Sequence, residues 1–171
     1  MSEQATKHLF QERDESASIL REWWKGLEHD KGERAVLRRS SSPAAVVFSP
    51  AYHRLLNQLR QRGYGVIPEA LAAVAGLAAH VKEDIGSDKT LAQQMASPKS
   101  GENRAKVSGL RFRRMLTVTQ HDELYHLLIR VIRLLDRKIN LVNLSNSVYW
   151  WNEKTRKNWA YDYYAAAPDE K

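Results

Sequence analysis

The segment 67–81 constrains the fold more than any other part of the sequence. It is apolar and rich in alanine, and Pro68 stands near its start, where a helix tolerates the missing N–H. Small alanine side chains let neighbouring helices approach closely, so the segment predicts a helix at the centre of a bundle. It is too short to span a membrane, and charged residues follow it at once. Its inner face comprises Leu71, Val74, Leu77, Ala78 and Val81.

The spacing of apolar residues elsewhere is also helical, and no segment shows the sustained period-2 alternation of a strand. The fold class is therefore predicted to be all-α. The pattern predicts further helices over about 16–28, 44–48, 51–62, 110–118, 124–135 and 147–167.

Capping residues predict where several of these helices begin. Asp30, followed three residues later by Glu33, is typical of a capping box and predicts a short helix that runs to Arg39. Ser42-Pro43 and Ser49-Pro50 each place a capping residue before a proline at the first helical position. Thr119 is predicted to cap the helix that follows it.

The stretch 86–107 interrupts the helical pattern with Gly, Ser, Asp, Asn, Pro and Lys, and only residues 90–96 suit a helical turn or two. We therefore expect two small helical bundles, or lobes, joined by a basic surface loop. The first fifteen residues lack the apolar core of a signal peptide, so we expect a cytoplasmic protein. The predicted units are an N-terminal tail (1–15), an N-terminal lobe (16–85), the connecting loop (86–107), a C-terminal lobe (108–167) and a tail (168–171).

The sequence offers no catalytic motif. It contains 0 Cys, which excludes disulfides, thiolate zinc sites, iron–sulfur clusters and a cysteine nucleophile. His121 and His126 are five residues apart and do not share a helix face, and His80 is interpreted as a packed ring or a helix-end cation. No glycine-rich phosphate loop is present. We therefore expect no metal, no cofactor and no enzymatic activity.

The charge balance points to a polyanionic partner. Lys and Arg total 27 against 20 Asp and Glu, which gives a net charge of +7 and a pI near 9.7. Such a pI is typical of nucleic-acid-binding domains, although basic domains with no such partner also exist. The distribution of the positive residues therefore matters more than their number.

The arginines gather on two predicted helices. Arg34 and Arg38 lie one i, i+4 step apart, opposite an apolar stripe. On the second helix, Arg114 points away from the apolar face, and Arg111 and Arg113 flank it. Planar guanidinium groups suit phosphate because they donate two parallel hydrogen bonds, whereas the alternative is pairing with acidic side chains on neighbouring helices. The preceding loop adds Lys99, Arg104 and Lys106, and the later helix carries Arg130, Arg133 and Arg137 along its solvent-facing edge.

Aromatic residues are concentrated near the C-terminus. They could stack on bases, as in single-strand binders, or form the core of the second lobe. Trp159 is interpreted as core, and both roles stay open for Tyr149, Trp150, Trp151, Tyr161, Tyr163 and Tyr164.

Three motifs follow one another along the chain. They are Trp23-Trp24 ahead of Gly32-Glu33-Arg34-Ala35-Val36-Leu37-Arg38-Arg39; Ser108-Gly109-Leu110-Arg111-Phe112-Arg113-Arg114-Met115-Leu116; and Arg156-x-x-Trp159-Ala160-x-x-Tyr163-Tyr164. Each motif is weak alone, but their order is more specific. Over about residues 16–164 the chain resembles the CasB family, the small subunit of the type I-E CRISPR surveillance complex Cascade.

The resemblance implies a non-catalytic subunit that pairs head-to-tail with a second copy. The implied partners are the crRNA-loaded backbone and large subunits, the target DNA and the displaced single strand, all contacted through backbone charge rather than base sequence. The alternative is a helical protein-interaction module that docks through its aromatic C-terminal helix. The candidate nucleic-acid contacts are Arg34, Arg38, Arg39, Lys99, Arg104, Lys106, Arg111, Arg113 and Arg114, and the possible partner or strand contacts are Lys154, Arg156 and Lys157.

Overall fold

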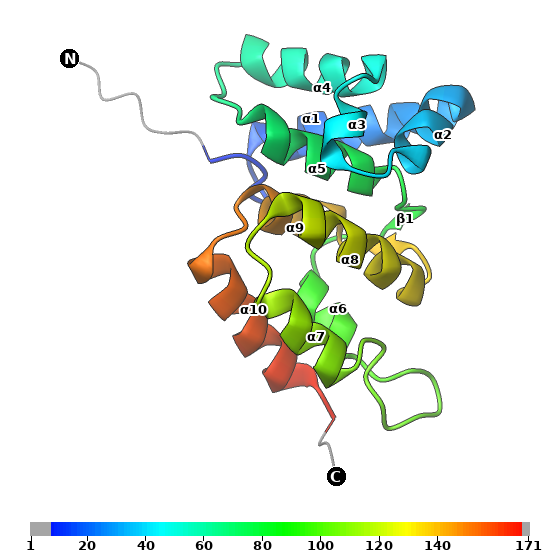
Figure 1. The fold of residues 1–171 in the computed structure, drawn as a ribbon, viewed down its shortest axis with the longest axis vertical. Helices are drawn as coiled ribbons and strands as arrows, with labels where there is room; N and C mark the ends of the chain where they lie inside the picture. The colour runs from blue at the N-terminus through cyan, green and yellow to red at the C-terminus, as the bar shows by residue number, and fades with distance from the viewer. Residues whose placement is uncertain (1–7, 169–171) are drawn as a thin grey trace, which may run out of the picture.

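The computed structural model describes residues 8–168, so the first seven residues of the predicted N-terminal tail and residues 169–171 of the C-terminal tail lie outside the described part. Within the described range the chain is predominantly helical (Figure 1), which confirms the all-α prediction. The α-helices are α1 (Glu15–Gly26), α2 (Lys31–Arg39), α3 (Pro43–Val46), α4 (Pro50–Gln61), α5 (Pro68–Ala78), α6 (Leu91–Ala96), α7 (Gly109–Leu116), α8 (His121–Leu134), α9 (Leu141–Tyr149) and α10 (Glu153–Ala166), with a 3₁₀ turn η1 (Leu27–His29).

Two very short strands escaped the sequence analysis. β1 (Glu83–Asp84) pairs in parallel with β2 (Lys138–Ile139). Alternation cannot be recognised over two residues, so the pairing depends on α5 and α8 ending side by side. The Arg137 carbonyl oxygen extends this junction by accepting from the backbone N–H groups of Lys82 and Glu83, at 2.8 and 3.2 Å.

Helix α5 lies at the centre of the molecule, as its alanine content predicts. It packs against α3, α9, α8, α2 and α4, and every residue from Ala70 to Ala78 is buried. The approach to α8 is closest at Gly76, where a Cβ atom would lie 2.5 Å from the Tyr125 hydroxyl oxygen. That hydroxyl donates to the Ser40 carbonyl oxygen at 2.8 Å, so one buried tyrosine connects α5, α8 and the end of α2.

The lower part of the molecule in Figure 1 contains α6, α7 and α10. α6 lies inside the predicted connecting loop and packs against α10, and Thr90 closes a capping box with Gln93. The Phe112 and Tyr163 rings stack with centroids 3.9 Å apart, which attaches α7 to α10. The buried apolar residues of the described chain form one continuous cluster, and the predicted division into two lobes stays a prediction.

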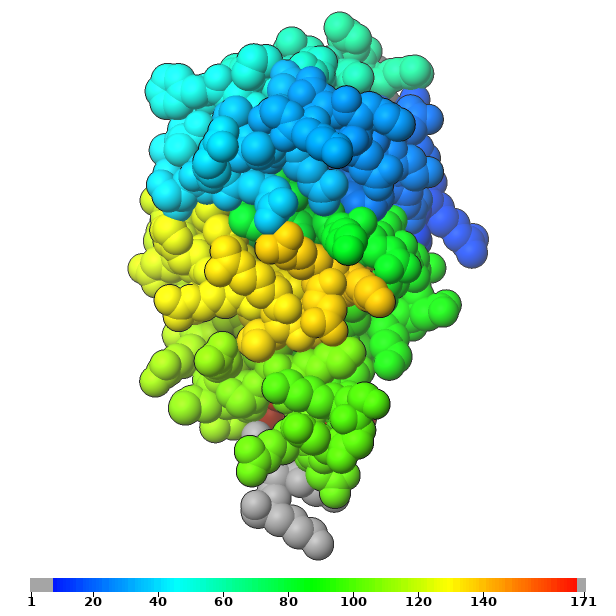
Figure 2. All heavy atoms as spheres, turned by 90° about the vertical axis from the view of Figure 1, so that its right-hand side faces the viewer, coloured from blue at the N-terminus to red at the C-terminus, as the bar shows by residue number. Residues whose placement is uncertain are grey.

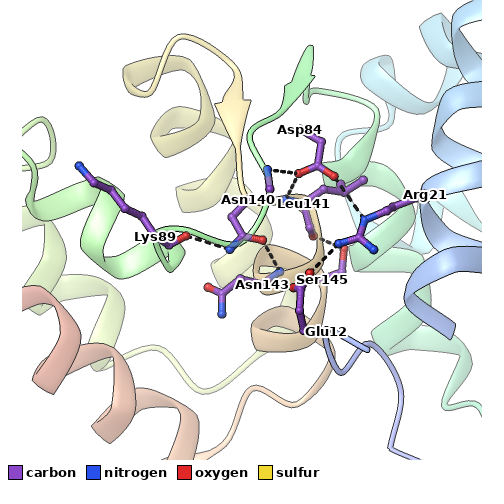
Figure 3. Close-up of polar contacts among 9 residues, drawn as sticks. Glu12, Arg21, Asp84, Lys89, Asn140, Leu141, Asn143 and Ser145 are labelled. Atoms are coloured by element: carbon purple, nitrogen blue, oxygen red, sulfur yellow. Dashed lines mark hydrogen bonds and ion pairs between the residues drawn. The ribbon is translucent and has the colours of Figure 1, made fainter. Parts of the chain in front are cut away.

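A polar junction ties the upper and lower helices together (Figure 3). The Asp84 Oδ1 atom accepts from the backbone N–H of Leu141 at 3.2 Å, while Oδ2 lies 3.6 Å from the Arg21 guanidinium. The Asn140 side chain donates to the Lys89 carbonyl oxygen at 2.8 Å and caps α9. Segments around residues 21, 84, 89 and 140 are thereby held together by hydrogen bonds and one ion pair, which a shift of any of these segments would break.

The predicted caps of α2 and α3 are present in the structure. Asp30 accepts from the Glu33 N–H at 3.0 Å, and Ser42 accepts from the Ala45 N–H at 3.3 Å. The capping box of α2 is incomplete, however, because the Glu33 carboxylate bonds to the Arg54 guanidinium instead.

Ser49 and Pro50 begin α4 as expected, but the buried Ser49 hydroxyl makes no capping bond and has no hydrogen-bond partner within residues 8–168. The residue that precedes α8 is Gln120 rather than Thr119, so that expectation is wrong. The region 147–167 is not one helix. It breaks after Tyr149 because Asn152 adopts an extended conformation and caps α10, so α9 and α10 are separate. Within residues 8–168, no helix combines the length and hydropathy needed to cross a membrane.

Candidate nucleic-acid interface

Arg34 and Arg38 project from one side of α2, as their spacing predicts, but their surroundings differ. The Arg34 guanidinium is half-buried and donates to the carbonyl oxygens of Ala79 at 3.1 Å and Val81 at 2.6 Å. It therefore satisfies backbone acceptors at the end of α5. Arg38 is exposed one turn further along the helix.

Arg133 and Arg137, from the C-terminal end of α8, lie beside this pair. Partial burial lowers the pKa of the Arg38 guanidinium, and the positive charges of Arg137, Arg34 and Arg133 lower it further. Within residues 8–168, no carboxylate forms an ion pair with any of these four side chains. We call these residues the four-arginine cluster.

His80 lies inside the four-arginine cluster. Its side chain is 5% exposed, and its Nε2 atom has no hydrogen-bond partner in the described chain. Burial lowers the pKa of His80 to about 4, and the positive charges of Arg38, Arg133, Arg137 and Arg34 contribute to this shift. The imidazole is therefore neutral at pH 7, which supports the packed ring among the two interpretations of His80. The cluster keeps its positive charge without an ion-paired carboxylate in the described chain.

A second group of arginines surrounds a hollow between α7 and α8. Arg111 and Arg114 of α7 and Arg130 of α8 line its rim. Its volume is about 130 Å³. Its floor is apolar and is made by Met115, Leu127, Val131 and Leu134.

Helix α8 connects the two groups. Arg130 and Arg133 lie one turn apart on α8. Arg137 lies beyond the end of α8, in a left-handed turn with φ 60°, so the expectation that it continues the edge of the helix is wrong. Arg130 belongs to the hollow, whereas Arg133 and Arg137 belong to the four-arginine cluster. The resulting arginine track comprises Arg34, Arg38, Arg137, Arg133, Arg130, Arg114 and Arg111.

The segments that carry the track follow one another along the long axis of the molecule. Figure 2 shows α2 in blue above the end of α8 and β2 in gold, with the yellow-green α7 segment below. The green loop between α6 and α7 continues this face toward the lower end of the molecule. Segments from separate parts of the sequence therefore share one side of the protein.

That loop carries the other predicted basic residues. An isolated bridge between Pro98 and Ala105 closes it, and the Lys99 N–H donates to the Arg104 carbonyl oxygen at 3.1 Å. The side chains of Lys99 and Arg104 are exposed, and that of Lys106 is half-buried. Arg39 and Arg113 are exposed too, but neither borders the cluster's histidine or the hollow.

The three basic residues of α10 have different surroundings. Lys154 is exposed, and Lys157 forms an ion pair with Glu153 at 3.0 Å. Arg156 is half-buried and donates to the Leu116 carbonyl oxygen at 3.3 Å, which ties α10 to the end of α7. Of the three, Lys154 is left with its charge exposed and without an ion pair in the described chain.

The C-terminal aromatic residues divide into core and surface. Trp159 is buried, as predicted, and its Nε1–H donates to the Ser147 hydroxyl at 3.0 Å. Tyr149, Trp151 and Tyr163 are buried as well. Tyr161 and Tyr164 are 78% and 52% exposed, so these two rings are available to a partner.

Arg130, Arg133 and Arg137 were not among the predicted contacts. Their i, i+3, i+7 spacing was visible, but it describes any solvent-facing helix edge. Only tertiary structure brings them near the other arginines, because α2 and α8 both pack on α5 and because α7 and α8 share the hollow. Within residues 8–168, no group of three His, Asp or Glu side chains has the arrangement of a metal site.

The described chain is a predominantly helical protein with arginines on α2, α7 and α8 that form no ion pair within residues 8–168. The family model of the CRISPR-associated protein Cse2 matches residues 33–164, and the chain therefore belongs to the Cse2 (CasB) family. The resemblance found in the sequence is thereby confirmed.

The structural comparison agrees with this assignment at the level of the fold. The chain is similar to one in the crystal structure of E. coli Cascade bound to a PAM-containing dsDNA target, with a TM-score of 0.67 and 16% sequence identity. The similarity covers 90% of this chain and 98% of that chain. No curated protein matches the sequence.

Proposed function

We propose that this chain is the non-catalytic small subunit of a type I-E Cascade complex in the cytoplasm, and that its arginine track holds nucleic-acid backbone in the target-bound complex. The observation that carries the proposal is the track itself: seven arginines from α2, α7, α8 and the turn after α8, with no ion-paired carboxylate in the described chain. Membership of the Cse2 family and the shared fold with a chain of E. coli Cascade support it.

The physical role of such contacts is to shift a nearly balanced equilibrium. Formation of the guide–target heteroduplex releases about as much free energy as loss of the DNA duplex costs, so small contributions decide whether the open state persists. Each guanidinium that binds a phosphate releases a condensed counterion, and the planar group donates two hydrogen bonds to adjacent oxygens. The track therefore stabilises opened target DNA or the displaced strand without reading sequence. Arg39, Lys99, Arg104, Lys106 and Arg113 are proposed as auxiliary contacts beside the track.

The salt dependence of binding tests this proposal. Binding of a labelled single strand to the isolated protein is measured by fluorescence anisotropy between about 50 and 200 mM salt. The variant Arg133→Gln with Arg137→Gln removes two track charges and should reduce the slope of log K against log salt by about 1.4, or 0.7 per phosphate contact.

Arg13→Gln with Arg60→Gln is the matched control. Both side chains are exposed and lie outside the track, and this double variant removes as much positive charge as Arg133→Gln with Arg137→Gln. An equal change of the salt slope in both double variants would mean that net charge alone drives binding, and the proposed track would be wrong.

Assembly with the crRNA-loaded backbone and large subunits, and with a second copy of this chain, is tested by co-purification. Failure to associate would contradict the assignment to Cascade.

The exposed tyrosines favour a protein partner on α10 as a second function. Tyr161 and Tyr164 present large rings to solvent on the same helix as the exposed Lys154, and tyrosine is enriched at protein interfaces. Tyr161→Ser with Tyr164→Ser should weaken co-purification with the other subunits and leave binding of the single strand unchanged. A loss of strand binding with intact co-purification would instead assign these rings to nucleic acid.

A further inference from the structure

The hollow between α7 and α8 combines charged and apolar surface, whereas a phosphate contact needs only the charge. Its rim carries three guanidinium groups, but its floor is apolar. We propose that this hollow receives one unstacked nucleobase from a strand whose backbone follows the arginine track. The proposal deepens the proposed function, on which it rests, by naming single-stranded nucleic acid as the ligand of this part of the track.

The floor suits the flat face of a base. Met115 and Val131 are buried at its bottom, and Leu127 and Leu134 are half-buried at its sides. None of these four side chains offers a hydrogen-bonding group beyond the weak acceptor of the Met115 thioether. A base that covers the floor therefore removes apolar surface from water on both partners, which is favourable.

The rim suits the rest of the nucleotide. A guanidinium plane stacks on a base face and at the same time donates from its edge to a phosphate. Within residues 8–168, no carboxylate forms an ion pair with Arg111, Arg114 or Arg130. These groups are therefore available on both sides of a bound base.

The size and position of the hollow favour a nucleotide over a peptide. An amphipathic helix needs a groove for anchors spread over two turns, whereas a hollow of about 130 Å³ accommodates one compact group. Arg130 belongs to the rim and precedes Arg133 by one turn of α8, so a backbone on the four-arginine cluster passes directly to the hollow. A paired base cannot enter without losing its partner, and the site should therefore prefer single strands to duplex.

The experiment compares strands that differ only in their bases. A labelled single strand of about 12 nucleotides, an abasic strand with the same phosphates, and a duplex of equal length are titrated with the full chain at one salt concentration. The natural single strand should bind about tenfold more tightly than the abasic strand, since one stacked base accounts for a factor of that order.

A variant that fills the hollow gives the second arm. Leu127→Trp should abolish the difference between the natural and abasic strands and leave the affinity for the abasic strand unchanged. Leu110→Trp is the matched control, because Leu110 is an exposed apolar residue on α7 outside the hollow. Thermal unfolding of both variants verifies the fold, and Leu134→Phe replaces Leu127→Trp if the latter unfolds.

The outcomes separate the two proposals. Equal, salt-dependent affinity for natural and abasic strands overturns the nucleobase site but keeps the phosphate track. Binding of the duplex as tightly as the single strand also overturns the nucleobase site. An acidic peptide that binds wild type but not Leu127→Trp, while strand binding is unchanged, identifies a protein-docking site instead. Failure of every nucleic acid to bind overturns the proposed function itself.

Discussion

Acidification should destabilise this protein through His80, and the structure provides the size of the effect. The His80 side chain is buried among the four-arginine cluster, which together with burial lowers its pKa from 6.5 to about 4. The perturbation is His80→Leu, which removes the titrating group and keeps an apolar side chain of similar volume.

The sign follows from where the proton binds. Below pH 6.5 the unfolded chain binds a proton at this histidine, whereas the folded chain stays neutral until the pH approaches 4. The free energy of unfolding is therefore unaffected by His80 above pH 6.5 and falls as the pH drops, by up to about 1.4 kcal/mol per pH unit. Near pH 4 the accumulated loss is about 3 kcal/mol.

The assay is urea unfolding of wild type and His80→Leu at about pH 7.5 and pH 4.5. Between these two values the wild type should lose about 2.5 kcal/mol more than the variant. The protein also loses stability in acid through carboxylates such as Asp14 and Glu33, whose pKa values hydrogen bonding lowers. This loss occurs in wild type and in His80→Leu alike. The difference between their free energies of unfolding therefore reports His80 alone.

His126→Leu serves as the control, because His126 is an exposed histidine on α8. The same loss of stability on acidification in wild type and His80→Leu would refute the reasoning.

A related measurement tests the four-arginine cluster directly. Arg133→Gln with Arg137→Gln removes two of the four neighbouring positive charges and should raise the pKa of His80 in an NMR titration.

Three substitutions test the packing around α5 and the polar junction, each by chemical unfolding. Tyr125→Phe leaves the Ser40 carbonyl oxygen without its donor and should reduce the free energy of unfolding by about 1–2 kcal/mol; no change would mean that the bond contributes nothing. Gly76→Ala places a methyl group 2.5 Å from the Tyr125 hydroxyl oxygen and should reduce the free energy of unfolding by about 1–2 kcal/mol. A variant more stable than wild type would contradict the close approach of α5 to Tyr125. Asp84→Ala removes the acceptor of the Leu141 N–H and should reduce the free energy of unfolding by about 2 kcal/mol. An unchanged free energy of unfolding would show that the polar junction does not stabilise the packing of the helices.

Local features of the sequence predicted most of the helices. A helix is held by hydrogen bonds between residues four apart, so the apolar spacing of 67–81 and the caps at Asp30 and Ser42 carry their information within a few residues. The same local reasoning failed at Ser49, whose hydroxyl is buried and makes no capping bond. It also missed the break between α9 and α10, where Trp151 turns inward to donate to the Val118 carbonyl oxygen.

The candidate site was only half predictable for the same reason. Composition and spacing identified an excess of arginine and placed Arg34 and Arg38 on one side of a helix, as the structure has them. Nothing in the order of residues brings Arg133 and Arg137 to that side, because the approach of α8 to α2 depends on how both helices pack around α5. The sequence alone therefore determined the helices, the charge and the family resemblance, while tertiary packing decided which charges share a surface and which histidine they surround. Coulombic and packing interactions depend on distance in space, and the folded chain alone sets that distance.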